Sequence, residues 1–195
     1  MNNLLELPVG LDNAIQGIQE DIYEQLPNYW NNTPFPIVGY GRVQRTPLNE
    51  GKEQPEYYTQ SKTFLPEWYD ASIKNYRDVF WDTKNGAQFC FLIDEEDKAL
   101  DEQTFLSKVT IVFWVNLERI YPIKEEQTVS RAHRDVMEVL RNYNFRRYQI
   151  NNIERGVDNI FRQYLTKNMR YNDMHPLHCF AVNVDLTYYL TDKCT

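Results

Sequence analysis

The chain has 195 residues, of which 42% are hydrophobic and 25% are charged, and its formal net charge is −7. A chain of this length buries enough apolar surface to fold as one domain without a disulfide or a metal ion. Its acidic balance argues against a dedicated nucleic-acid-binding protein, because such proteins present a basic surface to the phosphate backbone.

The first quarter of the chain predicts one helix followed by a short strand. Asp12 is a candidate N-cap, because its side chain can accept a hydrogen bond from the first turn. Apolar residues then recur at helical spacing: Ile15, Ile18, Ile22 and Leu26. We expect Pro27 to end this helix. A turn-rich link over residues 28–36 leads to a short strand over residues 37–44, which two glycines weaken.

The segment from about residue 45 to residue 62 is polar, contains prolines and shows no periodicity. It predicts an exposed loop or arm. Two interpretations stay open, namely an arm that orders on a neighbouring subunit and a mobile loop. Residues 64–80 then carry scattered aromatic side chains, whose spacing identifies neither a helix nor a strand.

Three later stretches predict a sheet. Asn85-Gly86 marks a turn before a buried strand over residues 87–93, and an acidic loop over 94–102 leads to a long strand over 105–120. The last strand, over 178–190, alternates apolar and other residues for thirteen positions. Alternation with a period of two builds a half-buried antiparallel sheet. We expect the last strand to pair inside this sheet, because its apolar face is continuous.

Two amphipathic helices are expected between these long strands. Pro122 ends the first strand, and Thr128 is a good N-cap for a helix. One face of that helix is apolar: Val129, Ala132, Val136, Val139, Leu140 and Tyr143. A second helix is expected from Asn152, with Ile153, Val157, Ile160, Phe161 and Tyr164 inside. The chain thus predicts a single α+β domain over residues 1–195, with a mostly antiparallel sheet and helices on one face.

The chain shows no signal for secretion or for membrane insertion. No run approaches the roughly 18 apolar residues of a membrane span, and the first ten residues lack the basic and apolar regions of a secretion signal. The cysteines at positions 90, 179 and 194 are odd in number and widely spaced. They favour reduced thiols in a cytosolic product over a disulfide framework.

The sequence pattern of the histidines and cysteines does not predict a metal site. His175, His178 and Cys179 look like a ligand cluster, but consecutive residues of an extended strand point to opposite faces. A third and a fourth ligand are missing nearby, so we expect no metal and no cofactor. We interpret His133 as a solvated helix histidine, because Asp135, two positions on, does not share its face.

The densest charge run is Asp94-Glu95-Glu96-Asp97. It is interpreted first as a solvated loop. Two functional alternatives stay open. One is a small metal-dependent nuclease that uses Asp94, Glu95, Glu96 and His133. The other is an acidic, channel-facing loop that repels the phosphates of passing DNA. The sequence has no glycine-rich phosphate loop, nucleophile elbow, paired CxxC or HExxH motif, so we assign no catalytic residue and expect no enzyme.

Aromatic residues are in excess, with 14 Tyr, 10 Phe and 4 Trp against only 7 Gly. Tyrosine and tryptophan combine a large apolar area with one polar tip, which suits protein–protein contacts as well as a core. We therefore name a candidate subunit interface, and it consists of Tyr57, Tyr58, Trp68, Tyr69 and Tyr76.

The order of these elements resembles that of the tail-terminator and tail-completion proteins of bacteriophage necks. The matching stretches are residues 12–26, 89–93, 109–117, 129–143 and 178–190. The step most like that family is VTIVFWVNLERIYP followed by TVSRAHRDVMEVLRNY, together with the closing strand HCFAVNVDLTYYL.

This resemblance implies a virion protein, made in the host cytoplasm, that forms a ring of identical subunits around the DNA channel. The ring would bind neighbouring neck, portal or tail proteins, and DNA would pass without being specifically bound. Residues 56–81 and the N-terminal helix would contact neighbours, while no membrane is involved. The alternatives are the small nuclease and a soluble adaptor outside the virion, which binds its partner through a sheet edge.

Overall fold

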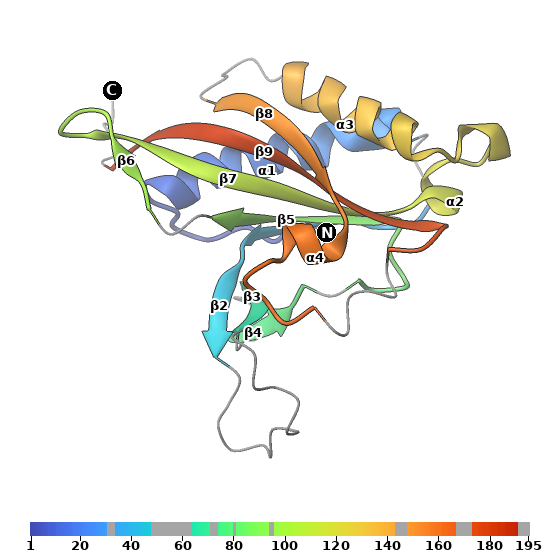
Figure 1. The fold of residues 1–195 in the computed structure, drawn as a ribbon, viewed down its shortest axis with the longest axis horizontal. Coiled ribbons are helices and arrows are strands. Elements are labelled where there is room, and N and C mark those ends of the chain that lie inside the picture. The colour runs from blue at the N-terminus through green and yellow to red at the C-terminus, as the bar shows by residue number, and fades with distance from the viewer. Residues whose placement is uncertain are drawn as a thin grey trace.

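The computed structural model describes residues 1–30, 34–47, 64–70, 74–79, 81–93, 96–142, 148–166 and 173–190 (Figure 1). The helices in this part of the chain are α1 (Leu11–Tyr29), α2 (Leu117–Ile120), the 3-10 turn η2 (Lys124–Glu126), α3 (Val129–Asn142) and α4 (Val157–Ile160). The strands are β1 (Ile37–Arg42), β2 (Gln44–Pro47), β3 (Phe64–Asp70), β4 (Asn75–Asp78), β5 (Ala87–Ile93), β6 (Lys98–Ala99), β7 (Thr104–Asn116), β8 (Tyr148–Arg155) and β9 (Leu177–Tyr189).

The fold is α+β, with a mixed, mostly antiparallel sheet of six strands. Its strands lie in the order β1-β5-β7-β9-β8, and the short β6 pairs with β7 off this path. Among the strands that the structure describes, only β1 and β5 pair in parallel within this sheet. The prediction that the last strand pairs inside the sheet is confirmed, because β9 has β7 on one side and β8 on the other.

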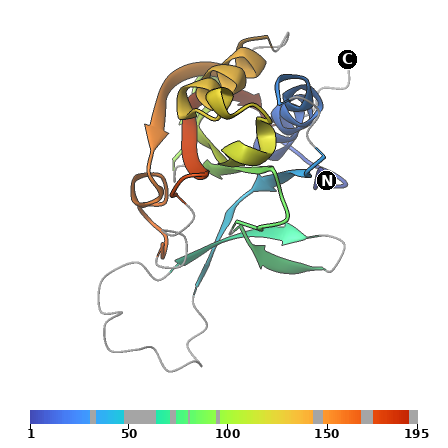
Figure 2. The same ribbon diagram turned by 90° about the vertical axis from the view of Figure 1, so that its right-hand side faces the viewer.

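A second sheet of three antiparallel strands, in the order β2-β3-β4, projects away from the first. Figure 2 shows α1 and α3 on one side of the main sheet and this small sheet on the other. The segment expected to begin as an exposed arm near residue 45 instead begins as β2. Residues 48–62, which make up the rest of that predicted arm, lie outside the described residues.

Both faces of the main sheet are buried at its centre. On β7, Ile111 and Phe113 belong to the core that α1 and α3 cover, whereas Val112 and Trp114 belong to a second core. This is the period-two alternation that the sequence predicts. The second core also contains Trp68 from the small sheet and residues of and after α4. The expectation of helices on one face alone is therefore wrong, because α4 packs on the face opposite α1 and α3.

The first helix differs at both ends from its prediction. It begins at Leu11 with Gly10 as N-cap, not behind Asp12, and it continues through Pro27 to Tyr29. Proline lacks an N–H and disfavours a helix interior. Here the last turn is held by burial, since Leu26 and Trp30 have no exposed surface and the Trp30 N–H donates to the Leu26 carbonyl at 3.0 Å. Packing thus outweighs the local preference for a helix end.

The second helix predicted after the long strand is wrong over its first turn, because residues 152–155 belong to a strand. Residues 148–155 form β8, and the helix that follows has only four residues. A β-bulge between Ile150 and Asn152 shifts the register of β8 on β9. Because a bulge inserts one extra residue, Ile150 and Ile153 both pack against the same core. Their spacing of three, which resembles that of a helix, is the result of the bulge.

Other boundaries agree more closely. The strand β5 has the predicted limits, and Thr128 caps α3 as expected, because its Oγ1 accepts a hydrogen bond from the Arg131 N–H at 3.3 Å. The long strand ends at Asn116, not at residue 120, since the Asn116 side chain caps the short helix α2. No helix within the described ranges has both the length and the apolar character needed to cross a membrane.

The first prediction concerns the aromatic residues at the centre of the main core. Phe113 is 1% exposed and its ring lies 5.9 Å from that of Phe89 and 5.3 Å from that of Phe180. We expect Phe113→Ala to lower the free energy of unfolding by about 3–5 kcal/mol in urea denaturation, since it leaves a cavity. The control Lys108→Ala replaces an exposed side chain of the same strand and should change stability by less than about 0.5 kcal/mol. Equal losses in the two variants would contradict this assignment.

Candidate functional site

The free edge of β1 is covered by the first residues of the chain. The Asn3 N–H donates to the Gly39 carbonyl and the Gly39 N–H donates to the Met1 carbonyl, each at 3.0 Å. The buried Gln19 side chain of α1 donates to the Asn2 side chain at 2.8 Å and to the Asn3 carbonyl at 2.9 Å. These bonds satisfy part of an edge that would otherwise present unpaired backbone groups.

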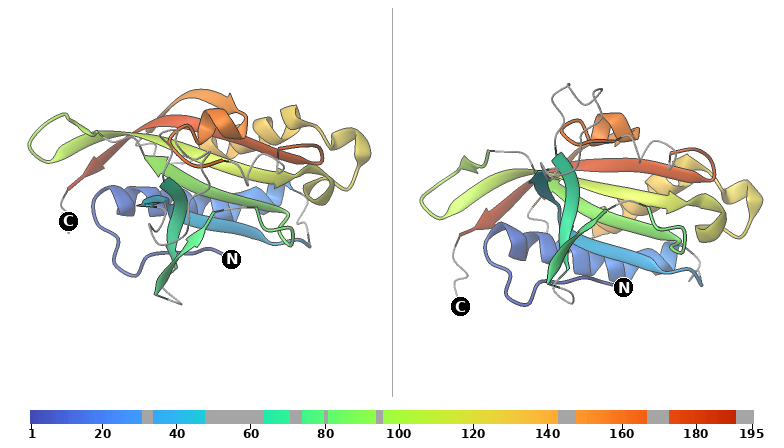
Figure 3. Two further views of the ribbon diagram at one scale, coloured as in Figure 1. Left: turned by 60° about the horizontal axis from the view of Figure 1, so that its bottom comes forward. Right: turned by 90° about the horizontal axis from the view of Figure 1, so that it is seen from below.

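A cleft of about 770 Å³ lies between this covered edge and the small sheet. Met1–Leu5 and α1 form one wall, β1 lies at its base, and β3 with β4 forms the other wall. Figure 3 shows this side of the molecule, with the small sheet nearest the viewer in the right-hand view. We call it the inter-sheet cleft.

The walls of the inter-sheet cleft combine ion pairs with aromatic rings. Arg42 lies 3.6 Å from Asp12, and Arg77 lies 2.9 Å from Asp70. The rings of Tyr40 and Trp68 are 4.8 Å apart, and burial, followed by the nearby charges, raises the pKa of Tyr40 to about 12. No serine, threonine, cysteine or histidine is among the described residues that line the cleft. The ionisable side chains of the described lining are carboxylates, arginines, one lysine and two tyrosines.

The predicted subunit-interface residues separate into three groups. Trp68 is 6% exposed and lies in the second core, so we correct its assignment from surface contact to core packing. Tyr69 and Tyr76 are 40% and 45% exposed, and they lie directly opposite each other on β3 and β4 with their rings 5.5 Å apart. Tyr57 and Tyr58 lie outside the described residues.

The predicted acidic cluster is only partly described. Asp94 and Glu95 fall outside the described residues, while Glu96 and Asp97 are exposed. Asp97 accepts a hydrogen bond from the Tyr188 hydroxyl at 2.7 Å. His133, which the nuclease alternative places with this cluster, contacts His178 instead. Ten positions along β9, or roughly 33 Å, separate His178 from Tyr188, so the structure does not bring Asp97 and His133 together.

His133 is buried, contrary to its prediction as a solvated residue. It is 6% exposed, and its ring centre lies 4.3 Å from that of Phe180. The sequence contains the missed signal, because His133 lies four residues after Val129 and three before Val136, on the apolar face of α3. Cys179 points to the other face of the sheet from His178, as expected. Over the ranges that the structure describes, no group of three metal-ligating side chains is found.

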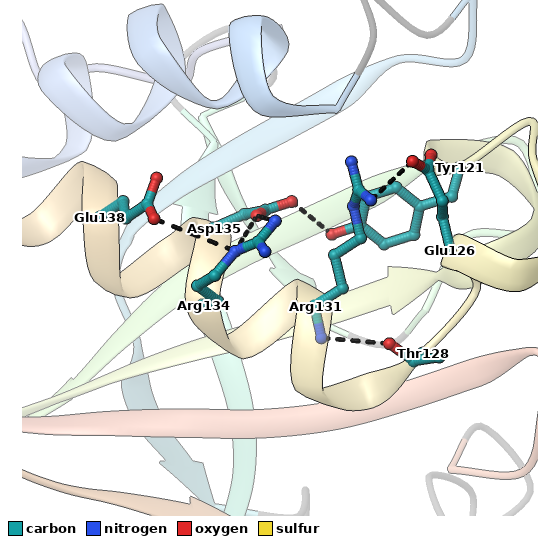
Figure 4. Close-up of polar contacts among 7 residues, drawn as sticks. All are labelled: Tyr121, Glu126, Thr128, Arg131, Arg134, Asp135 and Glu138. Atoms are coloured by element: carbon teal, nitrogen blue, oxygen red, sulfur yellow. Dashed lines mark hydrogen bonds and ion pairs between the residues drawn. The ribbon is translucent and has the colours of Figure 1, made fainter.

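A second buried polar cluster joins α3 to the segment before it (Figure 4). The Tyr121 hydroxyl donates to Asp135 Oδ2 at 2.6 Å, while Arg134 contacts the other carboxylate oxygen at 3.1 Å. Arg131 lies 5.2 Å from the Tyr121 ring centre and pairs with Glu126 at 2.6 Å. Burial, the hydrogen bond to Asp135 and its negative charge all raise the pKa of Tyr121. The cluster links α3 to the segment that precedes it.

Comparison of the chain with protein-family models, with curated proteins and with solved structures gives no match. The functional interpretation therefore depends on three features of the described residues. These are the inter-sheet cleft, the exposed aromatic pair on the small sheet, and the two buried polar clusters around α3.

The close approach of the N-terminal segment to β1 predicts a position-specific role for glycine. A Cβ atom on Gly39 would lie 2.7 Å from Asn2 Oδ1 and 2.8 Å from Phe89 Cζ, whereas one on Gly41 would be 3.6 Å from its nearest neighbour. We expect Gly39→Ala to lower stability by about 1–3 kcal/mol in urea denaturation. Gly41→Ala, on the same strand, should stay within about 1 kcal/mol of the natural protein. Two equal effects would show that Gly39 is not required for this approach.

The buried Tyr121–Asp135 bond gives a third prediction. Tyr121→Phe leaves a carboxylate oxygen that is nearly inaccessible to water without its donor, so we expect a loss of about 1–3 kcal/mol in the free energy of unfolding. Tyr188→Phe is the matched control, because it removes the same kind of bond from the exposed Asp97. It should cost less than about 1 kcal/mol. A larger loss for Tyr188→Phe than for Tyr121→Phe would refute this ranking.

Proposed function

We propose that the chain is a structural protein of a bacteriophage neck, a head–tail connector or tail terminator that assembles into a homo-oligomeric ring around the DNA channel. The order of the core elements supports this proposal. It runs from α1 through β5 and β7 to α3 and the closing strand β9, as in the resemblance described above. The neighbours of the ring would be adjacent neck, portal or tail proteins.

The observation that carries the proposal is the small sheet β2-β3-β4. It projects from the main sheet, and all four residues of its strand β4 are exposed. Within the described chain, β4 pairs with β3 and with no other strand. A strand of this kind presents backbone groups to which a neighbouring subunit can add a strand.

The side chains of the small sheet suit a protein contact as well. Tyr69 and Tyr76 form an exposed aromatic pair, and tyrosine is enriched in protein interfaces. Arg77 is held beside Asp70 on the neighbouring strand, at 2.9 Å, which fixes the shape of this surface before any partner arrives. A contact surface that is already ordered loses less conformational entropy on association.

The charges of the chain support passage of DNA without binding. The net charge is −7, and Glu96 and Asp97 are exposed beside β6. With Asp94 and Glu95, which lie outside the described residues, they are the candidate channel-facing loop. Carboxylates on the wall of a channel repel the phosphate backbone, so DNA would move through the ring without adhering to it.

The fourth prediction concerns assembly. We expect the purified chain to form closed rings, seen as a single large species in native mass spectrometry over a concentration series and as annuli in negative-stain images. Tyr76→Glu places a charge in the aromatic pair and should weaken association at least about tenfold, which corresponds to about 1.4 kcal/mol. Tyr189→Glu is the matched control, since Tyr189 is 47% exposed at the far end of β9, and it should assemble normally.

Three results would count against the proposal or against the interface assigned to it. A monomer at every concentration would exclude self-assembly and favour the adaptor interpretation, in which one copy binds one partner. Rings that form equally well from Tyr76→Glu would leave self-assembly intact but remove the small sheet from the interface. A plasmid-nicking assay with Mg²⁺ or Mn²⁺ tests the nuclease alternative, and metal-dependent cleavage by the chain would overturn the assignment as a purely structural protein.

A further inference from the structure

Two imidazole rings meet end to end beneath α3. His133 Nε2 on α3 lies 3.1 Å from His178 Nε2 on β9, and the two ring centres are 5.3 Å apart. With the two Nε2 atoms at this distance, the ring centres could lie only slightly farther apart than they do. The two nitrogens therefore point at each other, as in an N–H···N hydrogen bond, and leave no space for a metal ion between them.

The pair contacts one apolar ring and lies near a small number of charged groups. Phe180 lies beneath both imidazoles, at 4.3 Å from the His133 ring centre and 5.4 Å from that of His178. Asp173, which precedes β9, lies 3.4 Å from His178 Nδ1 and also accepts the Cys179 N–H at 2.9 Å. Arg155 on β8 adds a positive charge that acts on His133.

This geometry fixes which nitrogen atoms carry the protons of the neutral pair. Asp173 orients His178 with its Nδ1–H toward the carboxylate, so His178 Nε2 accepts the hydrogen bond that His133 Nε2–H donates. The second proton of His133 would then bind at its Nδ1. It would place a positive charge on a ring that is 6% exposed and lies near the positive charge of Arg155.

We propose that the His133–His178 pair makes the packing of α3 on the main sheet dependent on pH, because a positive charge on the buried ring of His133 weakens the contact of α3 with β9. The inference does not rest on the proposed ring function. It assigns to the two histidines a role as an acid-sensitive contact between one helix and the central part of the sheet.

The titration of His133 agrees with this inference. Burial, followed by the charges of His178 and Arg155, lowers the pKa of His133 to about 4. In the unfolded or released state, a histidine titrates near about 6.5. Between about pH 4 and about pH 6.5, His133 therefore binds a proton when α3 is released but not when α3 is packed on the sheet. The contact is therefore at full strength above about pH 6.5 and weakens as the pH falls toward 4.

Hydrogen exchange of backbone amides tests the proposal on the full chain. Between pH 6.5 and 4, protection factors in α3 should fall by up to roughly tenfold per pH unit, while those of β5 and β7 fall less. In His133→Gln, the side-chain amide can still donate to His178 but does not titrate, so the acid-dependent loss in α3 should shrink to less than about twofold per unit. His133→Phe, which also lacks a titrating group, should behave in the same way.

The third histidine provides the control. His175 lies outside the pair, so His175→Gln should keep the full pH dependence of the natural protein. The proposal is overturned if α3 protection in the natural protein is constant over this range, or if α3, β5 and β7 lose protection equally, which would indicate general acid unfolding. It is also overturned if His133→Gln and His133→Phe both retain the acid-dependent loss in α3.

Discussion

The pairing of β9 between β7 and β8 is the constraint on which the rest of the structure depends. It holds β7 and β8, which are distant in the chain, on either side of one strand. It thereby joins β8, with the segment that follows it, to the main sheet. Alternate residues of β9 also enter both cores: Phe180 and Val182 on the helix side, Cys179 and Ala181 on the other. Without β9, α1 and α3 would lose much of the apolar surface against which they pack.

Burial of both sheet faces separates the stable part of the molecule from the part that is free for contact. The main sheet is enclosed by α1 and α3 on one face and by α4 and the base of the small sheet on the other. The outer strand of the small sheet contributes no residue to these cores. Changes at β4 should therefore have little effect on stability, which suits the contact role proposed for this sheet.

The sequence predicted those elements in which local pattern and tertiary packing agree. The buried strand β5 and the alternation in β7 and β9 were predicted correctly, because the fold buries the residues on which these predictions depend. The cap at Thr128 was also predicted correctly. Prediction failed where packing overrides a local signal, as at Pro27, or where a helix-like spacing runs across two elements, as from Ile153 on β8 to Val157 on α4. The role of His133 depends on His178, 45 residues away, and no local pattern specifies such a partner.

The connectivity of β7 and β9 also affects how the chain reaches its native state. The two strands pair residues as distant as Thr104 and Tyr189, and a long stretch that includes α3 and β8 must be ordered around that closure. Contacts between distant segments form slowly, because the entropy of the intervening chain is lost before the contact stabilises it. An intermediate that holds only β5 and β7 would leave one edge of β7 open, beside Ile111 and Phe113. The yield of refolding should therefore fall as the protein concentration rises, since that open edge can pair with another copy.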